Sequence, residues 1–231
     1  MNSPLLILGM HRSGTSCLAG CLEAGGLSLG AVNTAAPHNK KGNRELEDVR
    51  ALHDRILSFH GYSWDCPPPS GLEWRPIDIQ ALKDKTEALA KQKSWGFKDP
   101  RTLFCMQGWE TVFKPRYVAT FRHPLSVMAS LMGRAKAWNE TMAASHARDL
   151  WIAYNRQLLD FTAGKETKFV KYGGDEAIYL ARIAELATHF GLDAEKAVGF
   201  YSSQLTNETP DTERVPDGCE AIWDELNARV K

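Results

Sequence analysis

The fold of this chain is decided by its N-terminal stretch, Leu5-Leu6-Ile7-Leu8-Gly9-Met10-His11-Arg12-Ser13-Gly14-Thr15-Ser16-Cys17-Leu18. An apolar run of strand length stops at Gly9, a turn with a second glycine at Gly14 follows, and helical apolar spacing begins at Cys17. Backbone N–H groups in such a turn, together with the positive end of the next helix, attract an anion. The stretch therefore predicts a strand, a phosphate-cradling loop and a helix.

The residue after Gly14 separates this loop from that of a nucleotide hydrolase. The spacing from Gly9 to Gly14 fits a P-loop, but an NTPase carries a lysine where this chain has Thr15. The sequence also shows no apolar strand that ends in a Mg²⁺-binding aspartate. We therefore expect Arg12 to supply the positive charge of the loop, and we expect no metal to be required.

Composition describes an ordinary globular protein. The chain has 231 residues, of which 43% are hydrophobic, so we expect one domain that covers residues 1–231. The 28 basic residues balance 28 acidic ones, which predicts neither a nucleic-acid partner nor an anionic membrane surface. The five cysteines show no metal-ligand pairing and favour a reducing compartment. No apolar segment has the length of a membrane span or the flanks of a signal peptide, which predicts a cytoplasmic location.

Strand and helix patterns alternate along the chain. Besides the N-terminal strand, strands are predicted at 94–98, 117–121 and 169–172. Helices are predicted at 14–25, 44–59, 77–92, 124–133, 148–161, 179–190 and 219–230. This alternation indicates an α/β fold with a parallel sheet that is covered on both faces. Ligands then bind at the carboxyl ends of the strands, where Lys98 and Arg122 lie.

Two segments outside this alternation receive separate predictions. Residues 60–76 contain three consecutive prolines, Trp64 and Trp74, which predicts an ordered surface loop or lid. The two tryptophans either form a wall for the substrate or hold the loop against the core. Residues 206–231 are predicted to be a polar tail with a short helix.

Three motifs carry a resemblance to a known family. Arg12-Ser13-Gly14-Thr15-Ser16 resembles the 5′-phosphosulfate loop of sulfotransferases that use 3′-phosphoadenosine-5′-phosphosulfate (PAPS). Arg122, at a strand end, and Ser130, eight residues later, resemble the family's 3′-phosphate motif, in which a guanidinium holds the phosphate through two hydrogen bonds. Phe97-Lys98-Asp99-Pro100 is similar to the strand-end Lys-Asp-Pro of bacterial and tyrosylprotein sulfotransferases.

The resemblance runs from about Leu5 to Gly191 and implies both a fold and a reaction. The fold is a three-layer sandwich around a mainly parallel five-stranded sheet, of the P-loop nucleoside triphosphate hydrolase-like type. The reaction moves the sulfuryl group of PAPS to a hydroxyl group and leaves adenosine 3′,5′-bisphosphate. Golgi members of the family usually carry a membrane anchor, and its absence here looks bacterial-like or cytosolic. The acceptor class is open: a small molecule, a carbohydrate or a peptide.

The resemblance also implies which residues bind the donor: Arg12, Ser13, Gly14, Thr15, Ser16, Arg122, Ser130 and Tyr172. Tyr172 either lies near the adenine or caps the sheet. The chain departs from its relatives in two places. The string Tyr172-Gly173-Gly174-Asp175 stands where many relatives have Tyr-Glu-Asp-Leu, and the tail lacks the glycine-rich, basic loop of cytosolic sulfotransferases.

Sulfuryl transfer depends on positioning and on charge stabilisation. We expect Arg12 and Lys98 to oppose the charge that builds on the bridging oxygen. By its resemblance to relatives with a glutamate shortly after a glycine, Glu45 is the expected general base, although it also fits as a helix-end carboxylate. His11, His38 and His53 are the alternative bases, and His53 also fits as a hydrogen-bonded core histidine.

Two other functions remain compatible with the sequence. A nucleotide or small-molecule kinase of the same fold would require ATP and Mg²⁺, and the missing P-loop lysine speaks against it. A non-catalytic nucleotide-binding or scaffold module would be favoured if Arg12, Lys98 and Glu45 did not converge.

Overall fold

A parallel sheet forms the centre of the molecule. The computed structural model describes residues 2–35, 41–201 and 213–230. The strands are β1 (Leu5–Leu8), β2 (Gly96–Lys98), β3 (Arg116–Phe121) and β4 (Thr167–Lys171). They lie in the order β2-β1-β3-β4, and all three pairings are parallel. The predicted α/β class with a parallel sheet is confirmed.

The sheet is buried on both faces because successive strand residues point to opposite sides. In β1, Leu6 and Leu8 belong to one hydrophobic cluster, and Leu5 and Ile7 belong to another. All four side chains are buried, which explains why this strand reads as a continuous apolar run.

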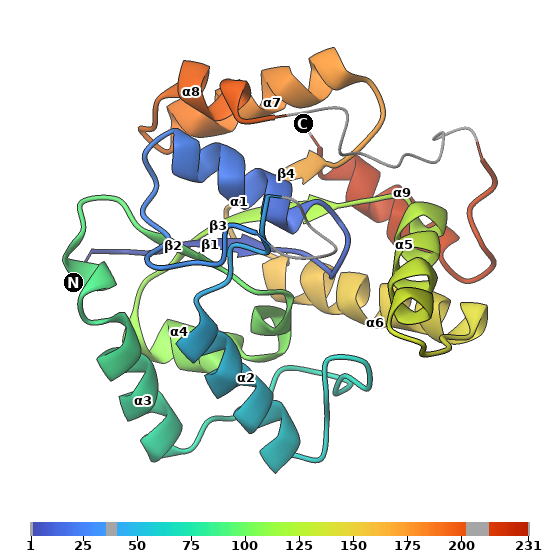
Figure 1. Cartoon of the computed structure of the whole chain (residues 1–231), viewed down its shortest axis with the longest axis horizontal. Helices are drawn as coiled ribbons and strands as arrows, with labels where there is room; N and C mark the ends of the chain where they lie inside the picture. The colour runs from blue at the N-terminus through green and yellow to red at the C-terminus, as the bar shows by residue number, and fades with distance from the viewer. Residues whose placement is uncertain (1, 36–40, 202–212, 231) are drawn as a thin grey trace.

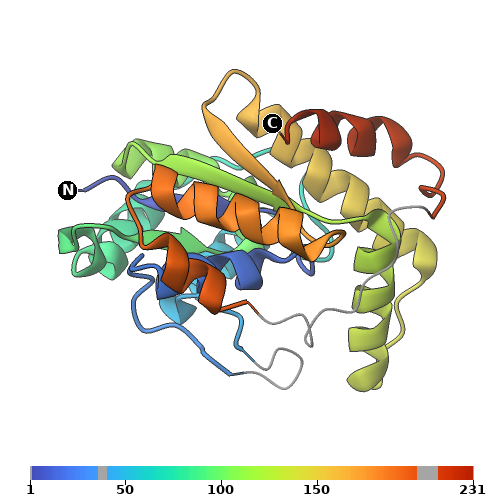
Figure 2. The same cartoon turned by 90° about the horizontal axis from the view of Figure 1, so that it is seen from above.

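Helices form a layer on each face of the sheet (Figures 1 and 2). One layer contains α1 (Thr15–Ala24), α7 (Glu176–His189) and α8 (Ala194–Gly199). The helices that contribute to the other hydrophobic cluster, the one with Leu6 and Leu8, are α2 (Glu47–Phe59), α3 (Pro76–Thr86), α4 (Met106–Val112), α5 (Pro124–Ala137), α6 (Ala144–Thr162) and α9 (Glu220–Ala228). Short 3₁₀ turns follow α3 at Leu89–Lys91 and β2 at Pro100–Phe104.

The implied fifth strand is not found among the described residues. Ser28 makes a single parallel bridge with Trp95, beside β2. The Ser28 N–H donates to the Ser94 carbonyl over 3.0 Å, and its carbonyl accepts from the Gly96 N–H over 3.0 Å. Gly26 and Gly30 flank this segment with φ values of +107° and +78°, so the chain turns away on both sides. The pairing consequently stops at one bridge, and the sheet has four strands in the described part of the chain.

The sheet order creates a crevice at the carboxyl end of β1. The chain passes from β1 to β2 on one side, and then crosses back to β3 on the other side. At such a switch point the connections on the two sides separate, and ligands bind there in open α/β sheets. The loop from Gly9 to Gly14 occupies this position. In the part of the chain that the structure describes, no helix is both long and apolar enough to cross a membrane.

Candidate active site

The loop after β1 presents the start of α1 to the crevice. Gly14 is the N-cap of α1 and adopts φ +84°, a conformation that favours glycine, and no side chain caps this helix. The first N–H groups of a helix have no acceptor within the helix. The loop itself is held by Thr120 at the end of β3, whose hydroxyl donates to the Ser13 carbonyl over 3.1 Å. The loop can therefore offer backbone donors to an anion.

Residues from three elements meet at this loop. The Arg12 Nε donates to the Ser130 hydroxyl on α5 over 2.8 Å, and the Arg122 Nη1 donates to the Arg12 carbonyl over 3.4 Å. Tyr172 follows β4, and its ring packs so closely on Gly14 that an added Cβ would lie 2.2 Å from it. The Arg122 guanidinium carbon lies 5.2 Å from the centre of the same ring. The structure thus brings together the residues of the two predicted phosphate motifs.

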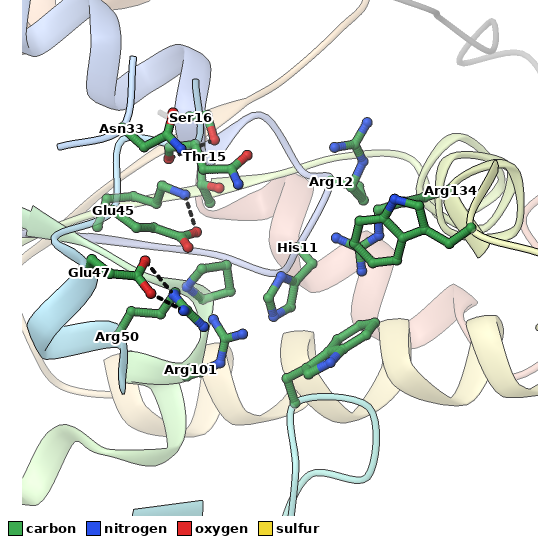
Figure 3. Close-up of a pocket in the computed structure, with 15 residues that line it drawn as sticks. His11, Arg12, Thr15, Ser16, Asn33, Glu45, Glu47, Arg50, Arg101 and Arg134 are labelled. Carbon is green, nitrogen blue, oxygen red and sulfur yellow. Dashed lines mark hydrogen bonds and ion pairs between the residues drawn. The ribbon is translucent and has the colours of Figure 1, made fainter. Parts of the chain in front are cut away.

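Lys98 and Glu45 form a largely buried ion pair next to the loop. The Lys98 Nζ donates to the Glu45 Oε1 over 2.7 Å, and the two side chains are 2% and 12% exposed. Lys98 is the last residue of β2, so its side chain starts at the carboxyl edge of the sheet. In Figure 3 the dashed line that ends on the labelled Glu45 carboxylate marks this pair.

Glu45 lies ahead of α2, which corrects the predicted helix over 44–59. The helix begins at Glu47 because Arg44 has φ +55°, which no helix accommodates. Arg44 pairs with Glu23 of α1, and its guanidinium lies 4.7 Å from the Phe200 ring centre. The Ser16 hydroxyl donates to the Asn43 carbonyl over 3.1 Å. These contacts attach Asn43 and Arg44 to α1. Because Glu45 lies outside α2, stabilisation of a helix end does not explain the position of its carboxylate.

A cavity of about 320 Å³ lies between these groups. Figure 3 shows Arg12 and Arg134 on one side, Glu45, Glu47 and Arg50 on the other, and His11 between them. The lining residues are His11, Arg12, Thr15, Ser16, Asn33, Asn43, Glu45, Glu47, Arg50, Trp64, Lys98, Pro100, Arg101, Arg134 and Trp138. Of the predicted catalytic residues, Arg12, Lys98 and Glu45 all line it.

A buried hydrogen-bonded chain holds Arg101 at the cavity. The Trp109 Nε1–H donates to His53 Nε2 over 3.0 Å, which leaves the ring proton of a neutral His53 on Nδ1 to face the Asp99 Oδ2 at 2.8 Å. Asp99 accepts from the Arg101 guanidinium over 2.9 Å. Burial alone would raise the pKa of Asp99, but the Arg101 charge and the His53 hydrogen bond outweigh it and hold that pKa well below its usual range.

The histidines considered as bases lie in different environments. His53 is fully buried and both ring nitrogens have partners, so it is the core histidine that the sequence allowed. His11 lies at the cavity, where burial and then the charge of Arg101 hold the pKa of its imidazole well below 6.5. His11 is therefore neutral at pH 7. His38 lies outside the described residues.

The two tryptophans of the 60–76 loop have different positions. Trp64 lines the cavity, and its ring centre lies 5.0 Å from that of His11. The Tyr154 hydroxyl of α6 fixes it by donating to the Trp64 carbonyl over 2.8 Å. Trp74 is buried in the core and packs on Gly108 of α4. Trp74 therefore holds the loop against the core, whereas Trp64 lines the candidate site, and its role as a wall for the substrate stays a prediction.

No sequence motif predicts a role for Arg50, Arg101 or Arg134, although all three line the cavity. Arg101 belongs to the charged cluster after β2, and this position at the carboxyl end of a strand could have identified it as a candidate site residue. Arg134 lies one helical turn after Ser130 on α5, so it shares a face with a residue that was identified.

The sequence matches no known family model and no curated protein. Its structure is similar to two solved sulfotransferase domains. The domain from the curacin biosynthetic pathway has a TM-score of 0.59 and 13% sequence identity, and the match covers 100% of this chain and 99% of that one. The domain from the Synechococcus olefin synthase has a TM-score of 0.54 and 19% identity, with 98% and 88% covered. The chain therefore has the fold of these sulfotransferase domains, as the motifs predicted.

Proposed function

We propose that the protein is a sulfotransferase that moves the sulfuryl group of PAPS to a hydroxyl group of an acceptor. The observation that carries this proposal is the convergence of Arg12, Lys98 and Glu45 on one cavity at the carboxyl edge of the sheet. The shared fold with sulfotransferase domains supports it.

The residues around the loop fit a donor that carries two separate anionic groups. The uncapped start of α1 suits the 5′-phosphosulfate, which would be held by N–H groups of Gly14, Thr15 and Ser16. Arg122 and Ser130, with Tyr172 beside them, suit the 3′-phosphate, because a guanidinium forms strong paired hydrogen bonds with a phosphate.

Charge stabilisation in this proposal comes from side chains. As the sulfur–oxygen bond to the 5′-phosphate breaks, negative charge builds on the bridging oxygen. Lys98 and Arg12 would oppose that charge. Both cations are held in place by hydrogen bonds, Lys98 to Glu45 and Arg12 to Ser130, so little reorganisation is needed during the reaction.

Glu45 is the proposed general base. The acceptor oxygen forms a bond to sulfur, its proton passes to the Glu45 carboxylate, and adenosine 3′,5′-bisphosphate leaves with the bonding electron pair. Glu45 lines the cavity, whereas His53 lies in the core with both ring nitrogens engaged. The neutral His11 imidazole is the alternative base at the cavity, and the second carboxylate there, Glu47, is paired with Arg50.

A ligand comparison tests the proposal. Adenosine 3′,5′-bisphosphate without metal should raise the melting temperature more than ATP with Mg²⁺ at the same concentration. A ligand at one hundred times its Kd stabilises the folded state by about 2.7 kcal/mol. A larger shift with ATP and Mg²⁺ would contradict the proposal and favour a kinase.

The arginines at the two ends of β3, Arg116 at its start and Arg122 just after its last residue, provide a matched control for the same experiment. Arg122→Ala should remove most of the preference for adenosine 3′,5′-bisphosphate over AMP. Arg116→Ala changes the opposite end of that strand, where the guanidinium packs on Phe190, and it should keep the preference. Equal losses for both nucleotides in Arg122→Ala would remove Arg122 from the 3′-phosphate site.

A further inference from the structure

Arg134 is a cavity cation that the donor chemistry leaves without a role. Two other cavity arginines are neutralised by carboxylates: Arg50 pairs with Glu47 and Asp54, and Arg101 pairs with Asp54 and Asp99. Within the described residues, Arg134 has no carboxylate partner within ion-pair distance, although it lines the same cavity.

Two indole rings enclose the Arg134 guanidinium. Its central carbon lies 4.8 Å from the Trp64 ring centre and 5.3 Å from that of Trp138. Burial lowers the pKa of Arg134, and the positive charge of Arg101 adds to the effect. The more distant carboxylates of Glu45, Glu140 and Asp65 act in the opposite direction but do not outweigh it, so the surroundings of Arg134 still disfavour its charged form. Aromatic faces offset only part of that cost. An anion in the cavity would supply the missing partner.

The position of Arg134 suits contact with an acceptor. Figure 3 shows it across the cavity from Glu45, with His11 between them. Arg134, Trp64 and Trp138 also line a second cavity of about 300 Å³, whose walls include the apolar Leu131 and Met142 and the acidic Asp65 and Glu140. The guanidinium thus borders both cavities, and an acceptor that extends from Glu45 toward the second cavity would lie beside it.

We propose that Arg134 binds an oxyanion of the acceptor, a carboxylate or a phosphate ester, on the same molecule as the hydroxyl group that receives the sulfuryl group. This inference rests on the proposed function. A planar guanidinium forms two parallel hydrogen bonds with such a group, and in a cavity partly closed by aromatic rings these bonds are strong. Arg134 then selects acidic acceptors over neutral ones.

Matched acceptor pairs test this selection by calorimetry. The protein is first saturated with adenosine 3′,5′-bisphosphate, so that the donor groups are occupied. It is then titrated with 4-hydroxyphenylacetate and 6-hydroxyhexanoate, with the corresponding amides, and with glycerol 3-phosphate against glycerol. The anionic member of at least one pair should bind about tenfold or more tightly than its neutral partner, and the favoured pair distinguishes carboxylate from phosphate recognition.

Variants assign the selection to one guanidinium. Arg134→Met should reduce the preference to below about threefold, and Arg134→Lys should keep part of it because the charge remains. The matched control is Arg50→Met, which removes the same charge from the same cavity at a position that is already ion-paired. It should change the preference by less than about threefold.

Several outcomes would overturn the proposal. One is an absence of anion preference in the wild-type protein, including the case in which no anionic probe binds. Another is a preference that survives in Arg134→Met or falls equally in Arg50→Met. A third is a loss of adenosine 3′,5′-bisphosphate affinity in Arg134→Met as large as the loss of acid affinity, which would place Arg134 at the donor.

The same titrations separate this inference from the proposed function. Binding of adenosine 3′,5′-bisphosphate without an acid preference contradicts the role of Arg134 and leaves the sulfotransferase proposal intact. An Arg134-dependent acid preference in a protein that does not bind adenosine 3′,5′-bisphosphate contradicts the sulfotransferase proposal and leaves an anion site.

Discussion

The imidazole of His11 links the site to the stability of the molecule. Its side chain lies among the rings of Trp64 and Tyr154, and its Nε2 is buried without a hydrogen-bond partner among the described residues. Burial and the nearby Arg101 disfavour its charged form, so the pKa of His11 lies below that of the unfolded chain. As the pH falls below about 6.5, the unfolded state binds a proton that the folded state does not bind.

We therefore predict that acid destabilises the protein through His11. The free energy of unfolding should fall below pH 6.5, with a slope for this group that approaches about 1.4 kcal/mol per pH unit. Asp99 has a lowered pKa, so the stability it contributes is lost only below about pH 4. Urea unfolding at pH 7.5 and pH 5.0 measures the His11 effect.

His11→Gln should lose less stability between these two pH values than the wild-type protein loses. His60→Gln is the control, because this histidine is exposed at the end of α2 and should leave the loss unchanged. The account of His11 fails if the wild-type protein and His11→Gln lose stability equally.

Among individual residues, the site residues that belong to linear sequence motifs could be predicted. Those whose position depends on the path of a neighbouring segment could not. Arg12, Lys98 and Arg122 follow strands whose carboxyl ends meet at one edge of the sheet, so their proximity follows from sequence order. Glu45 was chosen by resemblance alone, and its position depends on the left-handed backbone of Arg44. The use of Arg134 depends on the packing of α5 beside the 60–76 loop, which no local pattern encodes.

The junction between β1 and α1 is the element on which the proposed donor site depends. Gly14 combines a left-handed backbone with close packing against Tyr172, which follows the far strand β4. The junction is therefore fixed both by its own conformation and by the sheet.

Gly14→Ala should damage both stability and donor binding. A left-handed conformation costs a residue with a Cβ about 1–2 kcal/mol, and the Tyr172 ring must also move. We expect the free energy of unfolding to fall by at least that amount and the affinity for adenosine 3′,5′-bisphosphate to fall with it. Denaturant unfolding and calorimetry measure the two effects.

Gly133→Ala is the matched control for this change. Gly133 lies within α5, its added Cβ would contact nothing within 4 Å, and alanine in a helix is favoured by about 0.5–1 kcal/mol. This variant should be neutral or slightly more stable and should bind the nucleotide normally. Equal behaviour of the two variants would contradict the account of the junction.

Elements with a clear apolar pattern were predicted, and the two short helices α4 and α8 were not. The four strands and the helices around α1, α2, α6 and α7 follow from their apolar patterns, with ends that shift by a few residues. The helices α4 and α8 contain 7 and 6 residues, which is too short for a helical period to emerge. The implied fifth strand rests on the resemblance alone, and no apolar segment of the sequence predicts it.

The whole molecule explains why one site draws on distant parts of the chain. Parallel order β2-β1-β3-β4 brings the ends of all four strands to one edge, and α5 adds Ser130 and Arg134 from the side. The α/β fold class and the location of the candidate site could be predicted, because alternating strand and helix patterns allow few arrangements. The charge balance inside the cavity could not, because it depends on which carboxylate each arginine meets.

The most direct test of the proposed reaction follows the sulfuryl group itself. PAPS labelled with radioactive sulfur is incubated with the protein and with the small-molecule fraction of the cells that produce it. Four proteins are compared: the wild type, Lys98→Ala, Glu45→Gln and Glu47→Gln. Glu47 is the matched control, because it is a second carboxylate of the same cavity, paired with Arg50 at the start of α2.

The account predicts that the wild type and Glu47→Gln transfer the label to a hydroxyl compound. Glu45→Gln should transfer it about two to four orders of magnitude more slowly. Lys98→Ala should bind adenosine 3′,5′-bisphosphate nearly as well as the wild type and lose most of the transfer, because its charge acts in the transition state. Equal rates for Glu45→Gln and Glu47→Gln would remove Glu45 as the base and direct attention to His11. A wild-type protein that leaves the label on PAPS, but transfers the terminal phosphate of ATP, would contradict the central claim.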